Sequence, residues 1–110
     1  MPYYMFQGRY STDAIKAMVN TPQDRESAGR ALVESVGGKL HSLFFAFGAD
    51  DIVAIMEGPD DKTAAACSLA LGASGGFSGG SITKLMTTAD AMQAMTIAKK
   101  AAAGYKSPTG

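Results

Sequence analysis

His41 is the only histidine in this 110-residue chain and its first candidate for chemistry. An imidazole exchanges protons near neutral pH, so a histidine can act as a general base or bind a haem iron. Alternation along the surrounding segment predicts that His41 shares a strand face with Leu43 and Phe45, bordering a cavity. The alternative is a histidine near a strand end that lies at the surface or in an interface.

Two further candidates, Gln7 and Arg9, occupy alternate positions of the aromatic segment from Tyr3 to Tyr10. Alternation puts them on the same face as Tyr3 and Met5, where polar groups can orient a ligand in an apolar pocket. A guanidinium group suits a carboxylate or a phosphate. We therefore predict Gln7, Arg9 and His41 as ligand-binding residues at the mouth of a pocket between a sheet and helices. The alternative for Gln7 and Arg9 is an interfacial hydrogen bond or a solvated edge.

The other reactive side chains do not form a recognisable catalytic or metal-binding set. The acid pairs Asp50–Asp51 and Asp60–Asp61 lack the regular oxygen spacing of a calcium loop, so we expect them to serve turns and helix caps. Cys67 has no second cysteine and lies among alanines, which predicts an inert core thiol. No set of nucleophile, general base and acid can be assembled from the side chains, and no metal site or cofactor is evident. The sequence therefore leaves open whether the protein is an enzyme.

The elements that must position these residues follow from apolar periodicity and from helix caps. Thr21-Pro22 divides the first helical region in two, and Gly37-Gly38 ends it in a left-handed cap. Gly48-Ala49-Asp50 joins two strands in a hairpin whose glycine takes up a positive φ. Gly75 to Gly80 lacks the lysine of a phosphate-binding loop and is expected to be a loose connection. The expected strands are residues 3–10, 39–47, 51–57 and 81–87, and the expected helices are 13–19, 22–36, 61–73 and 88–103.

The order β-α-β-β-α-β with a terminal helix predicts an α+β, ferredoxin-like fold with a four-stranded antiparallel sheet. Both main helices would cover one face of that sheet. Neither face of the first two strands is plainly polar, so water is a poor partner for the free face. We therefore expect the free face to pack against the sheet of a second copy. Met92 and Met95 are expected on the apolar side of the terminal helix.

Composition limits the classes of function. Lys+Arg and Asp+Glu both number 10, giving a formal net charge of zero, and no basic stripe is present, which argues against nucleic-acid binding. The N-terminus lacks the pattern of a signal peptide, and no apolar run reaches the length of a membrane span. We expect one cytoplasmic domain over residues 1–104, followed by a mobile tail over residues 105–110.

Three segments carry a resemblance to a known family. They are Gly37-Gly38-Lys39, the hairpin from Phe47 to Val53, and Glu57 to Asp61 with the alanine-rich helix that follows. Along residues 2 to about 88 the chain resembles the GYD domain family of the dimeric α/β-barrel superfamily. Of the motif glycine, any residue, tyrosine, aspartate, Gly48 and Asp51 match, whereas Asp50 stands where tyrosine is usual.

The resemblance implies a homodimer with its sheets face to face. The wider superfamily includes isomerases, monooxygenases, haem proteins and ligand binders, so the resemblance implies no single activity. Three hypotheses stay open at this point. In the first, the protein is a homodimer that binds a small molecule. In the second, it is a cofactor-independent isomerase or monooxygenase-like enzyme with His41 as general base. In the third, it is a self-assembling module without a ligand.

Overall fold

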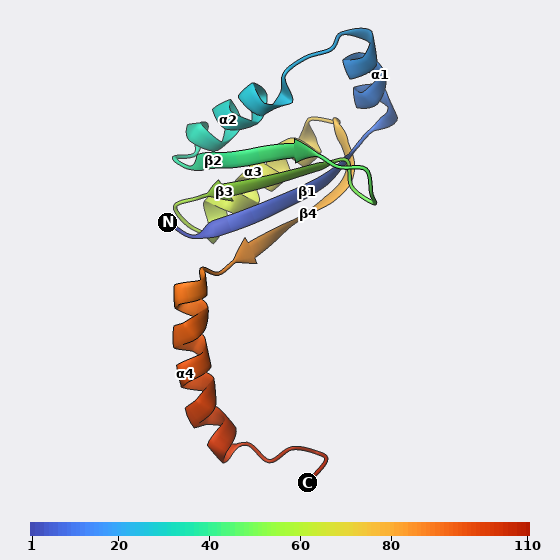
Figure 1. Ribbon diagram of the computed structural model, residues 1–110. Helices are drawn as coiled ribbons and strands as arrows, with labels where there is room; N and C mark the ends of the chain where they lie inside the picture. Colours follow the sequence, from blue (N-terminus) through green and yellow to red (C-terminus); the bar gives the residue numbers. More distant parts are fainter.

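The computed structural model describes residues 1–110 as a four-stranded antiparallel sheet with four helices (Figure 1). The sheet order is β2-β3-β1-β4, so the first strand lies in the interior and the second and fourth strands form the edges. This arrangement confirms the expected α+β, ferredoxin-like architecture. The elements are β1 (Tyr3–Tyr10), α1 (Thr12–Asn20), α2 (Arg25–Ser35), β2 (Lys39–Phe45), β3 (Ile52–Glu57), α3 (Asp61–Ala73), β4 (Phe77–Leu85) and α4 (Thr88–Gly104).

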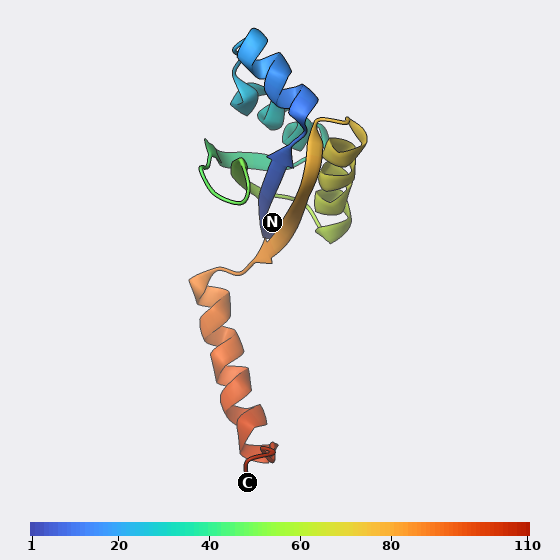
Figure 2. The ribbon, with the colours of Figure 1, turned by 90° about the vertical axis from the view of Figure 1, so that its right-hand side faces the viewer.

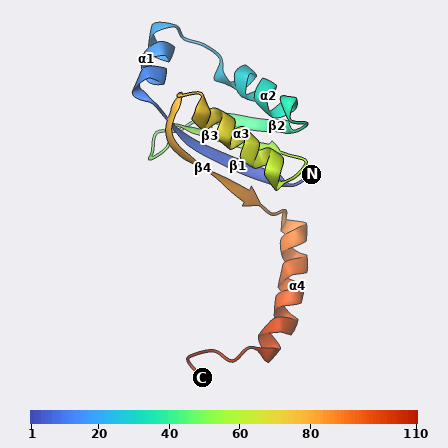
Figure 3. The same cartoon turned by 180° about the vertical axis from the view of Figure 1, so that it is seen from behind.

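Helices α2 and α3 lie on the same side of the sheet, as the view from behind shows (Figure 3). The core forms between them and the sheet because alternate strand residues point to that side. It consists of aromatic and aliphatic side chains from the strands together with three residues of the helices. Its members are Tyr4, Phe6, Tyr10, Val33, Leu40, Ile52, Ala54, Met56, Ala64 and Cys67. The opposite face of the sheet, called the open face below, carries no helix.

Most element boundaries agree with the sequence expectations, and the break between α1 and α2 lies at Thr21-Pro22 as expected. Gly37 has a φ of 82°, which confirms the left-handed cap after α2. Gly48 does not have a positive φ, so that expectation is wrong. The segment from Gly75 to Gly80 is also more ordered than expected, because β4 begins at Phe77 and pairs with the end of β1.

A bulge in β2 changes which of its side chains share a face. Leu40 pairs with Met56 and Ser42 pairs with Ile55, so His41 is an extra residue without a partner in the ladder. Simple alternation grouped His41 with Leu43 and Phe45, and this grouping is wrong. The bulge turns Leu43 towards α2, while His41 lies on the open face beside Glu57.

Helix α4 stands away from the rest of the chain (Figure 2). It has 17 residues and none of them is buried. It begins at an ordinary cap, in which Thr87 Oγ1 accepts a hydrogen bond from the Asp90 amide at 3.1 Å. None of the helices combines the length and the apolar composition that crossing a membrane requires.

Candidate functional site

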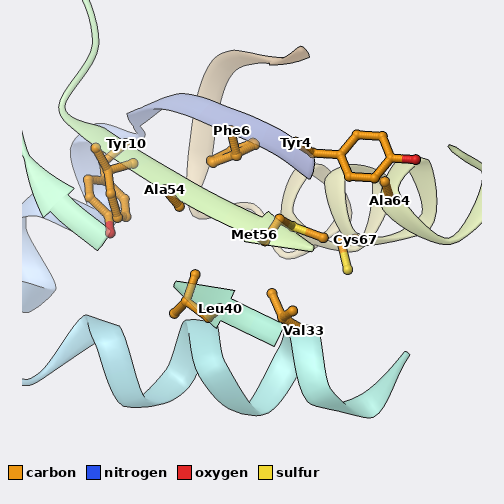
Figure 4. Close-up of a cluster of buried hydrophobic side chains, with 10 residues drawn as sticks. Tyr4, Phe6, Tyr10, Val33, Leu40, Ala54, Met56, Ala64 and Cys67 are labelled. Atoms are coloured by element: carbon orange, nitrogen blue, oxygen red, sulfur yellow. The ribbon is translucent and has the colours of Figure 1, made fainter. Parts of the chain in front are cut away.

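A hollow lies between the sheet, α2 and α3, with a volume of about 80 Å³. Figure 4 shows the buried core cluster, most of whose side chains line the hollow: Val33 extends from α2 towards Met56 on β3 and Cys67 on α3. Three aromatic rings, Phe6, Tyr10 and Phe77, also line the hollow. Nearly all of its lining is apolar, which is typical of a site for a small molecule.

Small residues on the facing elements leave room for this hollow. Ala28 and Gly29 on α2 and Ala54 on β3 all line it. A Cβ atom added at Gly29 would lie 3.2 Å from Leu43 Cδ1, so even one methyl group there crowds the wall. Gly29 therefore allows α2 to approach Leu43 of β2 closely, and the small side chains of Ala28 and Ala54 line the hollow.

The polar groups in the lining are few. They are the side chains of Arg25 and Ser68, the Tyr10 hydroxyl and the Cys67 thiol. Arg25 is the first residue of α2, and its Nη1 donates a hydrogen bond to Gln23 Oε1 at 2.8 Å. Burial raises the pKa of the Tyr10 hydroxyl, and the neighbouring Arg25 guanidinium partly offsets that rise. A guanidinium beside an apolar wall can hold the acidic end of a ligand whose remainder is apolar.

The aromatic rings at this end of the hollow are fixed by one another. Tyr10 and Phe77 stack with ring centroids 4.7 Å apart, and Phe6 meets Phe77 edge-on at 5.5 Å. Burial raises the pKa of the Cys67 thiol, which keeps it protonated and supports the expectation of an inert core residue.

Gln7, Arg9 and His41 do not line this hollow. All three lie on the open face, so the expectation that they stand at the mouth of a pocket between sheet and helices is not met. His41 Nε2 is 2.8 Å from Glu57 Oε2, and its ring lies 5.5 Å from that of Tyr3. Arg9 Nε donates to the Ala49 carbonyl at 3.0 Å, which ties the hairpin to β1. Their role in binding a ligand stays a prediction.

The structure does not bring these three residues together. Gln7 and Arg9 are four and six positions along β1 from Tyr3, the neighbour of His41. At about 3.3 Å per residue, His41 and Arg9 lie near opposite ends of the open face. A single small molecule could not contact both ends of this face.

A second polar cluster, which the sequence interpretation missed, joins the start of α3 to the sheet. The Tyr4 hydroxyl donates a hydrogen bond to Asp61 Oδ1 at 2.5 Å, and Lys84 Nζ lies 3.0 Å from the same oxygen. The hydrogen bond to Asp61 raises the pKa of Tyr4 to about 12, and the same bond, together with Lys84, lowers the pKa of Asp61. The cluster ties α3 to β1 and β4.

Asp51 and Asp60 perform the turn and cap roles expected of them. Asp51 Oδ2 accepts a hydrogen bond from the Tyr10 amide at 3.0 Å, which fixes the hairpin against the end of β1. Asp60 Oδ1 accepts one from the Thr63 amide at 2.8 Å, which caps α3. Of the motif residues, Asp51 therefore has a clear structural role, whereas the Asp50 side chain makes no hydrogen bond within the chain.

Comparisons with known proteins agree with this architecture. The sequence model of a family described as GYD domain matches residues 4–95. No curated protein matches the chain. Among solved structures, the crystal structure of MtbAldR is similar, with a TM-score of 0.53 and 15% sequence identity. The match covers 78% of this chain and 52% of that chain, so this chain spans about half the length of its structural neighbour. At this identity the likeness concerns the fold alone.

Proposed function

The chain belongs to the GYD domain family, and we propose that it acts as a homodimer that binds a small, mainly apolar molecule with an acidic end. In this proposal the open faces of two copies pack together. Each copy then binds its ligand in the hollow on the opposite side of its own sheet. The observation that carries the proposal is the apolar hollow with the Arg25 guanidinium in its wall.

The composition of the open face supports dimerisation. Met5, Val53, Ile55 and Phe44 share this face, and Phe44 is 68% exposed. A row of large apolar side chains across the centre of a sheet is typical of a surface that another protein covers. The charged groups, Arg9 and the His41–Glu57 pair, lie nearer its ends. The uncharged polar side chains of Gln7, Ser42, Ser81 and Thr83 border the apolar ones.

The chemistry of the hollow supports the class of ligand. The aromatic and aliphatic walls favour a hydrocarbon chain or ring, and water inside would find few hydrogen-bond partners there. Arg25 supplies a positive charge, and Ser68 supplies a hydroxyl group. The volume of about 80 Å³ admits only a compact molecule unless α2 and α3 move apart. A short-chain carboxylate fits these requirements.

Titration with hexanoate and with 1-hexanol, followed by NMR of the amide groups, tests this proposal. Hexanoate is expected to shift the Gly29 and Ser68 amides and to bind more tightly than 1-hexanol. Replacing Arg25→Gln should remove that difference, because only the carboxylate uses the guanidinium. Lys62→Gln is the matched control, since Lys62 is an exposed cation on α3 that does not line the hollow.

Two results would reject the proposed ligand class. In the first, neither probe shifts amides that border the hollow. In the second, the Arg25 and Lys62 variants weaken hexanoate binding equally, which would indicate general attraction between opposite charges. Shifts confined to the open face would move the binding site to Gln7, Arg9 or His41.

An isomerase or monooxygenase-like activity with His41 as general base is the second candidate. The Glu57 carboxylate, 2.8 Å from His41 Nε2, supports it because such a partner can fix the tautomer and orientation of an imidazole. His41 is about one-third exposed in the single chain, so only the dimer could enclose it. Unchanged turnover by a His41→Ala variant would reject this candidate for any substrate that the wild-type protein converts.

A further inference from the structure

We propose that α4 is an arm that packs on a second copy of this chain. The proposal rests on the homodimer proposed above and adds a contact surface that the sheet faces do not provide. Three large apolar side chains of α4, those of Met92, Met95 and Ile97, are 66%, 67% and 71% exposed. No residue of α4 is buried within its own chain.

Most apolar residues of α4 lie on one side of the helix, which also carries Lys99 and Asp90. At 100° per residue, Met92 and Met95 lie on one side of a row of alanines with Lys99 between them, and Ile97 lies on the other side next to Asp90. The opposite side of the helix carries Thr96 and Lys100. A row of small residues between larger ones lets another backbone approach closely while the methionine and isoleucine side chains pack around it. The row is Ala91, Ala94, Ala98 and Ala101.

The surface area of the chain supports a second copy as the partner. A compact protein of 11.3 kDa exposes about 5,700 Å², whereas this chain exposes 7465 Å². The excess of about 1,700 Å² per chain is about twice what each partner contributes to a standard interface. The radius of gyration, 17.9 Å, also exceeds the value of about 13 Å expected for a compact domain of this length.

The places of the unburied apolar surfaces favour a second copy over a rearrangement within one chain. Besides α4, Ile15 and Val19 of α1 and Phe45 and Phe47 of the hairpin line one exposed groove. The elements that form this groove, α1 and the connection between β2 and β3, lie at the opposite end of the strands from α4 (Figure 1). If α4 folded back on its own sheet, it would cover the open face and leave the groove exposed. A second copy can cover all of these surfaces.

Photocrosslinking in the full-length protein tests the arm directly. One population carries p-benzoyl-phenylalanine in place of Met95 and is unlabelled, and the other is wild type and labelled with ¹⁵N. After mixing, subunit exchange and irradiation, we expect covalent dimers that contain one unlabelled and one labelled chain. The matched control carries the same group in place of Lys100, on the polar side of α4, and should yield at least about fivefold less covalent dimer.

The outcomes separate this inference from the proposed dimer. Dimers seen by light scattering without mixed crosslinks from position 95, or with crosslinks only inside one chain, would overturn the arm and leave the sheet-face dimer standing. Monomers in light scattering would overturn both. Equal yields from positions 95 and 100 would show random encounters and would also overturn the arm.

Substitution provides an independent readout. Replacing Met92, Met95 and Ile97 together by glutamine keeps helix propensity and touches no buried residue, so the protomer should still fold. The dimer dissociation constant should rise by about 100-fold or more, because each of these side chains loses its burial against the partner. The control replaces Thr96 and Lys100 by glutamine and should leave that constant unchanged. Equal dissociation constants for both variants would overturn the proposal.

Discussion

Replacing Phe44→Ser on the open face tests whether this face is the dimer interface. Phe44 lies on the edge strand β2 opposite Val53, and it is 68% exposed in the single chain. Because this ring makes little contact within the protomer, its loss should hardly change the folding stability of one chain. Its loss should weaken the dimer strongly, since in the dimer the ring is expected to lie against the partner sheet.

The expected size of the effect follows from the exposed area. A phenylalanine side chain offers about 200 Å², so 68% exposure leaves about 135 Å² for the partner to cover. At about 25 cal/mol per Å², complete cover would stabilise the dimer by about 3.4 kcal/mol for each ring. If half of that area is covered, the two rings of the dimer together contribute about 3.4 kcal/mol. The dissociation constant of the variant should therefore rise by about 300-fold.

Sedimentation equilibrium over a range of micromolar concentrations measures this constant. The matched control is Leu69→Ser, because Leu69 is 74% exposed on α3 and lies away from the open face. The control should dissociate like the wild type. Equal dissociation constants for the Phe44 and Leu69 variants would refute the assignment of the interface to the open face.

Two further predictions concern stability. Gly38→Ala should lower the free energy of unfolding in urea by about 1–3 kcal/mol, because the new Cβ would lie 2.5 Å from the Glu57 carbonyl oxygen. The control Gly48→Ala should be neutral or slightly stabilising, because its Cβ would have no atom within 4 Å and Gly48 has no positive φ. Equal losses of unfolding free energy in the two variants would contradict this reasoning. The raised pKa of Tyr4 stabilises the fold below pH 10, and this stabilisation is lost between pH 10 and about 12. The lowered pKa of Asp61 stabilises the fold above about pH 3.8, and this stabilisation is lost at more acid pH. Tyr4→Phe should therefore make the alkaline decline in the free energy of unfolding smaller, and an unchanged decline would contradict the coupling between the two groups.

The order of the elements and the class of the fold were predictable because local signals agree with the tertiary arrangement. Thr21-Pro22 breaks the first helical region, Gly37 supplies a left-handed cap, and Asp60 caps α3, each through a mechanism that acts within a few residues. Strand alternation also grouped the residues of β1 into its two faces correctly, but it did not show which face the helices cover. Tyr4, Phe6 and Tyr10 are buried, whereas Tyr3 and Met5 are on the open face.

The details of the candidate site were not predictable, because they depend on contacts between distant residues. The bulge at His41 has no local signature, and one extra residue reverses the faces of Leu43 and Phe45. Likewise, Arg25 resembles any charged residue in the first turn of a helix. Only the packing of α2 over Tyr10 brings its guanidinium to the wall of the hollow.

The same limit applies to the cluster around Tyr4. The sequence contains a tyrosine on the first strand and an acid at the start of a helix, 57 positions apart. Their hydrogen bond requires β1 and the start of α3 to be neighbours, a relation that the ferredoxin-like order implies only in outline. A tyrosine hydroxyl on the helix-covered face was the one available signal, because a buried hydroxyl needs a partner.

The most direct measurement of the central claim, that the open face is the dimer interface, is an isotope-filtered NOE spectrum. The sample is a dimer formed from ¹³C-labelled and unlabelled full-length chains, so that every filtered signal connects two different copies. Packing of the open faces predicts intermolecular NOEs from the side chains of Met5, Phe44 and Ile55. Intermolecular NOEs from the outer surface of α3, such as Leu69, with none from these three residues, would contradict the claim.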